Sequence, residues 1–236
     1  MISFIVPAYN EELELPSTIA AIRNAAMTAN QEHEIIVVDD GSDDATAEIA
    51  RSVGALVVSI QRRQIAAARN AGARAARGDV LFFVDADTRI NSKHVVDAMA
   101  ALNAGCAGGS AQIEAHGPVP LWGRVFLRLF CALYFSMKLG AGAFLFTTRK
   151  NFDAVEGLDE TLFIGEEVYF SLALKKLGRF KILSEPIITS GRKLRMYSAG
   201  QILSRSFSII LRGRRGASSR AGLDLWYDGK RETTST

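Results

Sequence analysis

Acidic residues stand directly after two apolar runs in the first half of the sequence. Asp39 and Asp40 follow Ile35-Ile36-Val37-Val38, and Asp85-Ala86-Asp87 follows Val80-Leu81-Phe82-Phe83-Val84. Two carboxylates crowded at the end of a buried strand are costly unless a cation or a proton neutralises them. Hard ions such as Mg²⁺ or Mn²⁺ take one or two carboxylates together with diphosphate oxygens. Asp85 and Asp87 therefore indicate a site for such an ion, with an ordinary Asp-rich turn as the alternative.

The Asp39 segment continues as Asp40-Gly41-Ser42-Asp43. An acid at the end of a buried strand can hydrogen-bond a ribose or a base edge, as in nucleotide-binding βα turns. The residues after Asp39 have a structural interpretation, because Asp40-Gly41 is typical of a turn and Ser42 with Asp43 would cap the following helix. Asp39 is left as the candidate ligand-binding group.

Two other segments carry polar groups at the ends of expected elements. Gly165-Glu166-Glu167 opens a helix, where one acid could act as a general base at the mouth of a pocket or simply favour the helix dipole. Pro7-Ala8-Tyr9-Asn10-Glu11-Glu12 follows the first expected strand. Its side chains could frame a nucleobase, with a surface loop as the alternative.

An alternation of strands and helices would bring these segments to one edge of a sheet. We expect strands at 2–7, 35–39, 55–60 and 80–84, and helices at 43–53, at 64–76 and from Ser92 or Lys93. The last helix would place Val95, Val96, Met99 and Leu102 on one apolar stripe. Right-handed crossovers then predict a doubly wound, mostly parallel α/β sheet with helices on both faces and a ligand site at the carboxyl ends.

The second half is less regular. It predicts strands near 109–115 and 181–183, helices at 121–137 and 166–177, and an apolar segment at 143–147. We expect one domain over residues 1–212, followed by a basic and then polar tail over 213–236.

Composition excludes several protein classes. The 236 residues are 48% hydrophobic and 22% charged, which excludes a disordered or fibrous chain. Two distant cysteines and the absence of a signal-peptide pattern predict a cytoplasmic protein. The net charge of +3 hides two segments without acids, 115–152 with five basic residues and 186–223 with eight. These indicate either a partner that carries phosphates or a solvated basic face.

The expected helix at 121–137 interleaves Trp122 and Phe126 with Arg124 and Arg128. Such a helix either packs on the core or lies on an anionic membrane surface. We retain both interpretations, and the second would suit a lipid-linked substrate and a location on the inner face of the membrane. Lys138 and two glycines interrupt the longest apolar stretch, so we expect no membrane span.

These motifs, in this order, resemble family 2 glycosyltransferases of the GT-A fold over roughly residues 1–195. Ile5–Glu12 is similar to their opening strand and loop, and Val37–Thr46 to their nucleotide motif. Ala67–Asp79 and Phe83–Asp87 resemble the segment that leads into their metal site. Further along, Phe144–Phe152, Glu156–Glu160 and Gly165–Glu167 resemble their acceptor side and base helix.

The resemblance implies an inverting, metal-dependent transfer of a sugar from a nucleotide sugar, expected to be a UDP-sugar, to an acceptor hydroxyl. It implies that Asp87 binds Mg²⁺ or Mn²⁺, with Asp85 beside the ribose, the sugar or the ion, and that Glu167 is the base. The implied nucleotide-binding residues are Pro7, Tyr9, Glu11, Asp39, Arg69 and Asp85.

Two departures from the family pattern bear on these roles. Glu166-Glu167 stands where the family usually has Glu-Asp, which leaves the base open between the two residues. Ser190-Gly191-Arg192-Lys193 stands where many members place a histidine near the metal, so Arg192 and Lys193 are either diphosphate contacts or surface charges.

Three other functions are compatible with parts of the sequence to different degrees. A catalytically silent nucleotide-sugar-binding or scaffold protein of the same fold is the main alternative. A dinucleotide-dependent oxidoreductase is disfavoured because no GxGxxG motif follows Val6. We expect no nucleic-acid partner, since the arginines of the C-terminal segment lack interleaved aromatic residues.

Overall fold

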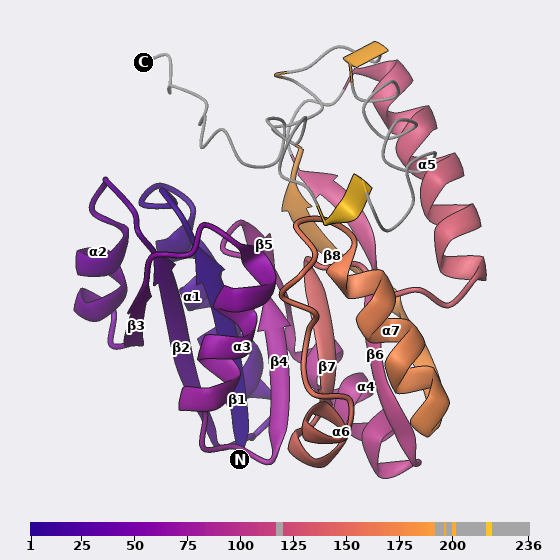
Figure 1. Cartoon of the computed structure of the whole chain (residues 1–236), viewed down its shortest axis with the longest axis horizontal. Helices are drawn as coiled ribbons and strands as arrows, with labels where there is room; N and C mark the ends of the chain where they lie inside the picture. Colours follow the sequence, from indigo (N-terminus) through magenta and orange to yellow (C-terminus); the bar gives the residue numbers. More distant parts are fainter. Residues whose placement is uncertain (117–119, 192–195, 197–199, 202–215, 219–236) are drawn as a thin grey trace.

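Among the residues that the computed structural model describes (1–116, 120–191, 196, 200–201 and 216–218), the strands form one eight-stranded sheet. Its order is β3-β2-β1-β4-β7-β6-β8-β5, and helices flank it (Figure 1). The strands are β1 (Ile2–Ala8), β2 (His33–Asp40), β3 (Leu56–Ile60), β4 (Val80–Val84), β5 (Thr88–Arg89), β6 (Cys106–His116), β7 (Phe144–Thr148) and β8 (Arg179–Ser190). The helices are α1 (Leu15–Thr28), α2 (Thr46–Ser52), α3 (Ile65–Ala75), α4 (Ser92–Asn103), α5 (Leu121–Ser136), α6 (Arg149–Ala154) and α7 (Glu166–Leu177).

The strands β1, β2 and β4 lie parallel inside the sheet, as their uninterrupted apolar runs predicted. Ala8 pairs with Asp39 and Ile5 with Phe83, so the three strands end at the same edge. The pairs β2–β3 and β6–β8 are also parallel, whereas β7 is antiparallel to both of its neighbours. The doubly wound, mostly parallel α/β sheet is confirmed; the apolar segment at 143–147 forms an antiparallel strand in it, and the short β5 is antiparallel to β8.

Two apolar cores lie on opposite faces of the sheet. Phe4 and Phe82 pack with α1, α2 and α4 on one face, and Ile5 and Phe83 pack with α3, α6 and α7 on the other. The inner face of α3 is lined by alanines, which lets its backbone approach the sheet closely. A Cβ atom added at Gly72 would lie 2.4 Å from Cγ2 of Ile5. Glycine at position 72 therefore lets α3 pack closely against β1 and β2.

Several local expectations were wrong. The helix expected at 43–53 begins at Thr46, and neither Ser42 nor Asp43 caps it. The Ser42 hydroxyl instead accepts a hydrogen bond from the Asn10 N–H of a neighbouring loop (3.0 Å). Val96 is exposed, so the buried stripe of α4 follows Val95 and Ala98, and Asn91 is the residue that caps this helix.

Helix α5 stands at the end of the molecule where β6 and β8 terminate (Figure 1). Within the described part of the chain, no helix is both long enough and apolar enough to cross a bilayer. Ala217, which belongs to the segment expected as a tail, is buried, and its carbonyl accepts a hydrogen bond from the Phe163 N–H (2.7 Å).

Candidate functional site

The loop after β1 is held against the loop after β2. The Asn10 N–H donates to Ser42 Oγ (3.0 Å), and the Glu11 N–H donates to Thr46 Oγ1 (2.8 Å). Asp43 in turn donates its N–H to Asn10 Oδ1 (2.9 Å). The polar side chains that follow β2 therefore fix the shape of the neighbouring loop, which keeps Tyr9 close to the end of β2.

Four sequence-predicted nucleotide-binding residues meet at this edge. Pro7 pairs with Val38 near the end of β1, and Glu11, in the loop that follows, is buried. The Tyr9 hydroxyl lies 3.4 Å from Asp43 Oδ2, and the Arg63 guanidinium lies 3.2 Å from the centroid of the Tyr9 ring. Asp39 is buried, and Oδ1 of its carboxylate accepts the Ser42 N–H (3.1 Å). Their contact with a nucleotide stays a prediction.

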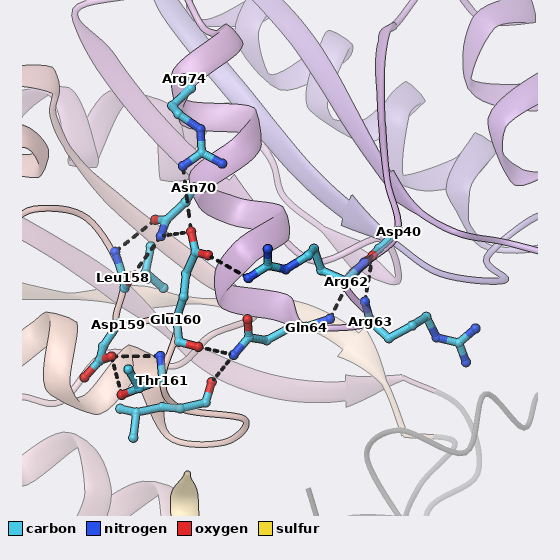
Figure 2. A network of polar contacts seen from close by, with 11 residues as sticks. Asp40, Arg62, Arg63, Gln64, Asn70, Arg74, Leu158, Asp159, Glu160 and Thr161 are labelled. Atoms are coloured by element: carbon cyan, nitrogen blue, oxygen red, sulfur yellow. Dashed lines mark hydrogen bonds and ion pairs between the residues drawn. The ribbon is translucent and has the colours of Figure 1, made fainter. Parts of the chain in front are cut away.

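The neighbouring Asp40 has a structural function that the sequence analysis missed. Its carboxylate accepts the backbone N–H groups of Arg62 (2.6 Å), Arg63 (2.8 Å) and Gln64 (2.7 Å). Figure 2 shows this carboxylate at the start of α3. Charge-assisted bonds of this kind are stronger than neutral ones, so Asp40 fixes the turn that leads into α3 and holds Arg63 in a left-handed conformation (φ 51°). The sequence signal for this function was the position of Asp40 at the end of a strongly apolar run.

Helix α3 also anchors the segment that leads into α7 (Figure 2). The Gln64 side chain donates to the carbonyls of Glu160 and Leu162, the second at 3.1 Å. The Asn70 amide donates to the Leu158 carbonyl (2.8 Å) and accepts the Leu158 N–H (2.9 Å). These bonds fix residues 158–162 against α3, and the next turn of the chain carries Glu166 and Glu167.

Arg69 joins the two acidic segments that the sequence singled out. Its guanidinium lies 2.6 Å from Glu166 Oε1 and 2.9 Å from Asp85 Oδ1, and it donates to the Gly142 carbonyl at 2.8 Å. The side chain is only 1% exposed. A Cβ atom at Gly142 would lie 2.9 Å from Nη2, so glycine leaves the space that the guanidinium occupies. Arg69 thus holds the end of β4 against the start of α7.

Burial and neighbouring charge set the protonation of these groups. Burial disfavours the Arg69 cation, but Asp85 and Glu166 outweigh it and raise the pKa of Arg69. Desolvation raises the pKa of Asp85 to about 6; Arg69 opposes this shift and Asp87 adds to it. The pKa of the half-buried Glu167 is raised to about 8 by desolvation and by the adjacent Glu166.

The two adjacent acids therefore differ: Glu166 is paired with the Arg69 cation, and Glu167 has a raised pKa. Glu166 is buried and accepts a hydrogen bond from Arg69 through Oε1, whereas Glu167 is more accessible. Tyr134 on α5 is also near the pair, since burial and then the charges of Glu167 and Glu166 raise the pKa of its hydroxyl. Tyr134 was not among the predicted site residues, because the sequence of its helix indicated only core packing or contact with a membrane surface.

The family model described as "Glycosyl transferase family 2" matches residues 3–148. The chain belongs to this family. The chain is 37% identical over 105 residues to 4,4'-diaponeurosporenoate glycosyltransferase of Staphylococcus haemolyticus, over 42% of the chain and 27% of that protein. It is 35% identical over 94 residues to undecaprenyl-phosphate 4-deoxy-4-formamido-L-arabinose transferase of Aeromonas hydrophila, over 37% and 29%. The match thus spans less than a third of the length of either relative.

Solved structures resemble the chain over most of its length. The mannosyltransferase PcManGT of Pyrobaculum calidifontis, in complex with GDP-Man and Mn²⁺, superposes with a TM-score of 0.66 at 19% identity, over 90% of this chain and 64% of that one. TarS of S. aureus in complex with UDP-GlcNAc gives a TM-score of 0.64 at 19% identity, over 90% and 66%. These similarities confirm the GT-A fold.

Carboxylates at this edge of the sheet have the donor chemistry for a divalent ion, provided that other oxygens complete its coordination. Asp85 and Asp87 are hard oxygen donors two residues apart, and Asp87 Oδ1 accepts the Thr189 hydroxyl (3.3 Å). The described residues contain no group of three acids, histidines or cysteines that could hold a metal alone. Mg²⁺ and Mn²⁺ are suited to such a pair, because diphosphate and water oxygens complete their coordination. Arg192 and Lys193, predicted as diphosphate contacts, lie outside the described residues.

Proposed function

We propose that this family 2 glycosyltransferase moves a sugar from a nucleotide sugar, specifically a UDP-sugar, to an acceptor hydroxyl with inversion at the anomeric carbon. The observation that carries the proposal is the Arg69 bridge, which holds Asp85 and Glu166 at 2.9 and 2.6 Å from one guanidinium. A donor-side carboxylate and the acidic start of α7 are thereby neighbours, as a single displacement requires.

The relatives support the choice of substrates. TarS was solved with UDP-GlcNAc, and PcManGT with GDP-Man and Mn²⁺. The Aeromonas relative is named as a transferase for undecaprenyl phosphate. We therefore propose a nucleotide-sugar donor and a lipid-linked acceptor, with the enzyme acting at the inner face of the membrane. We assign the catalytic domain to residues 1–212 and a basic, then polar, tail to 213–236.

Glu167 is the proposed general base. Glu166 is buried and one of its carboxylate oxygens is paired with the Arg69 guanidinium, whereas Glu167 is more accessible and has a raised pKa. Its carboxylate takes the proton of the acceptor hydroxyl as the oxygen attacks the anomeric carbon from the face opposite the diphosphate. The bond from that carbon to the diphosphate oxygen breaks, and the electron pair leaves with the diphosphate.

The chain's own residues prepare this step. Arg69 sets the position of both Asp85 and Glu166, and Tyr9, Pro7, Glu11 and Asp39 bind the nucleotide at the carboxyl ends of β1 and β2 in this proposal. Asp87 and Asp85 would hold Mg²⁺ or Mn²⁺, which neutralises charge on the leaving diphosphate when bound.

The test of the donor site is calorimetric titration of UDP, with and without Mn²⁺. We expect binding that depends on Mn²⁺ in the unaltered chain and is lost in Asp87→Ala. Asp97→Ala is the matched control, because Asp97 is paired with Lys93 on the surface of α4. The absence of UDP binding under all conditions, or equal binding by Asp87→Ala, would overturn the assignment.

A second experiment separates the enzyme from a silent binding protein. With Mn²⁺ and a panel of UDP-sugars, release of UDP should be detectable and should fall on the order of a hundredfold or more in Glu167→Gln, which still binds UDP. UDP binding without hydrolysis or transfer for any sugar would instead support a scaffold protein.

A further inference from the structure

Helix α5 presents a line of large apolar side chains to the outside of the molecule. Leu121 is 76% exposed, Val125 51%, Leu133 67% and, directly after the helix, Met137 50%. Their spacings are multiples of four residues, so they follow one i, i+4 row, which is inclined to the helix axis and winds partly round the helix. Single exposed apolar residues are normal on a protein surface, but four in one line are typical of an interaction site.

Positive charge accompanies this apolar line. Arg124 and Arg128 on the same helix are exposed, as is Lys138 just beyond it. No acidic residue occurs anywhere between Glu114 and Asp153. A helix with an apolar line and only basic charges has the composition that binds an anionic lipid surface.

The C-terminal end of α5 is fixed to the base helix α7. The Tyr134 hydroxyl donates to the Gly140 carbonyl (2.7 Å), and Ser171 Oγ on α7 accepts the Gly140 N–H (2.9 Å). Lys175 Nζ on α7 donates to the Met137 carbonyl (2.7 Å). The exposed line of α5 therefore has a defined position relative to Glu166 and Glu167, at the first turn of α7.

We propose that the outer face of α5 docks the protein on an anionic lipid bilayer, with the four apolar side chains at the acyl boundary and the arginines at the headgroups. Charge decides against a second copy of the chain as the occupant. An isologous contact through α5 would bring Arg124 and Arg128 of both copies together with no acid on the helix to neutralise them. A bilayer that contains anionic lipids supplies both the apolar and the negative partner.

This inference deepens the proposed function and rests on it only for the acceptor. Docking through α5 would hold the start of α7 at the surface where the hydroxyl of a lipid-linked acceptor is found. The lipid-binding surface itself requires neither the donor site nor the base.

The test is sedimentation of the full chain with phosphatidylcholine vesicles, either pure or mixed with an equal part of phosphatidylglycerol. We expect binding to the mixed vesicles that weakens as salt is added. Arg124→Ala combined with Arg128→Ala should weaken the partition by about thirtyfold, and Leu133→Glu should abolish it. Met27→Glu is the matched control, because Met27 on α1 is 65% exposed and should leave binding unchanged.

Circular dichroism would establish that Leu133→Glu and Met27→Glu are folded. Failure of the unaltered chain to bind mixed vesicles, or equal binding by Leu133→Glu and the unaltered chain, would overturn the inference. Sedimentation velocity tests whether a second copy of the chain occupies this face instead. If the unaltered chain forms a dimer that Leu133→Glu dissociates, and does not bind vesicles, the inference is also overturned. UDP titration of the same proteins keeps the two proposals distinguishable, since Leu133→Glu should bind UDP normally whatever it does with vesicles.

Discussion

Replacing Arg69 by Met would remove the cation between two buried carboxylates while keeping most of the side-chain volume. The side chain of Arg69 is 1% exposed and that of Glu166 4% exposed. Removing one partner of a buried ion pair leaves an uncompensated charge, which costs about 3–5 kcal/mol of the free energy of unfolding. For a chain of this size we expect the melting temperature to fall by about 10 °C near pH 8.

The loss of stability caused by Arg69→Met should depend on pH, and the direction of this dependence follows from the pKa of Asp85. Its pKa in the folded chain is about 6, above the value of an exposed Asp, so ionising Asp85 costs stability as the pH rises from about 4 through 6. Arg69 lowers that pKa, and without Arg69 the ionisation costs more. The difference in melting temperature between Arg69→Met and the unaltered chain should therefore be smaller at pH 5 than at pH 8.

Differential scanning calorimetry of both proteins at the two pH values measures this effect. Arg74→Met is the control, because Arg74 lies on the same helix but is exposed and 3.7 Å from Glu160. A surface pair of this kind contributes about 0–1 kcal/mol, so its loss should be small and independent of pH. A destabilisation by Arg69→Met no larger than that of the control, or one that does not grow with pH, would refute the reasoning.

Three other predictions concern the base, a loop and a close contact. The transfer rate at saturating substrates should rise with pH towards a plateau above about pH 8, because the raised pKa of Glu167 keeps it protonated at lower pH; a flat pH–rate profile would contradict this. Asp40→Ala should cost about 3 kcal/mol in urea unfolding, since three backbone N–H groups lose a charged acceptor, whereas exposed Asp43→Ala should change little. Gly72→Ala should cost about 1–3 kcal/mol in thermal unfolding, because its methyl group would lie 2.4 Å from a buried carbon of β1. Gly200→Ala is the control, because a Cβ atom there has no neighbour within 4 Å. Equal losses of stability in the two variants would argue against the packing explanation.

The sheet could be predicted from sequence because its inner strands are short, uninterrupted apolar runs. Continuous runs such as Ile35–Val38 and Val80–Val84 need cover on both faces, and this requirement fixes them inside a doubly wound sheet. The acids that follow them were therefore expected at one edge, where the structure has them. The antiparallel direction of β7 depends on how the second half of the chain returns to β4, and an apolar segment of five residues contains no signal for direction.

Side-chain partners across long sequence separations were harder to predict. Ser42 has the residue type of a helix cap, but its hydroxyl binds the loop after β1. Arg69 was grouped with the nucleotide-binding residues, and nothing local indicates that it contacts Glu166, 97 residues further along the chain. Local propensity determines which hydrogen-bonding groups a residue offers, whereas the packed fold determines which partner is close enough to take them. The roles of the site residues towards a nucleotide and a metal stay predictions.

The Arg69 bridge also constrains the order in which the chain folds. Burying Arg69 before Glu166 arrives would leave the guanidinium with one carboxylate, and Glu166 lies beyond residue 148, where the family match ends. We expect the N-terminal strands to pair early, and the closure of α3 onto the sheet to become favourable once α7 is in place. We therefore expect the last step of folding to be a long-range closure, and a nascent chain that has not yet extended past α7 to keep this part of its core open to chaperones.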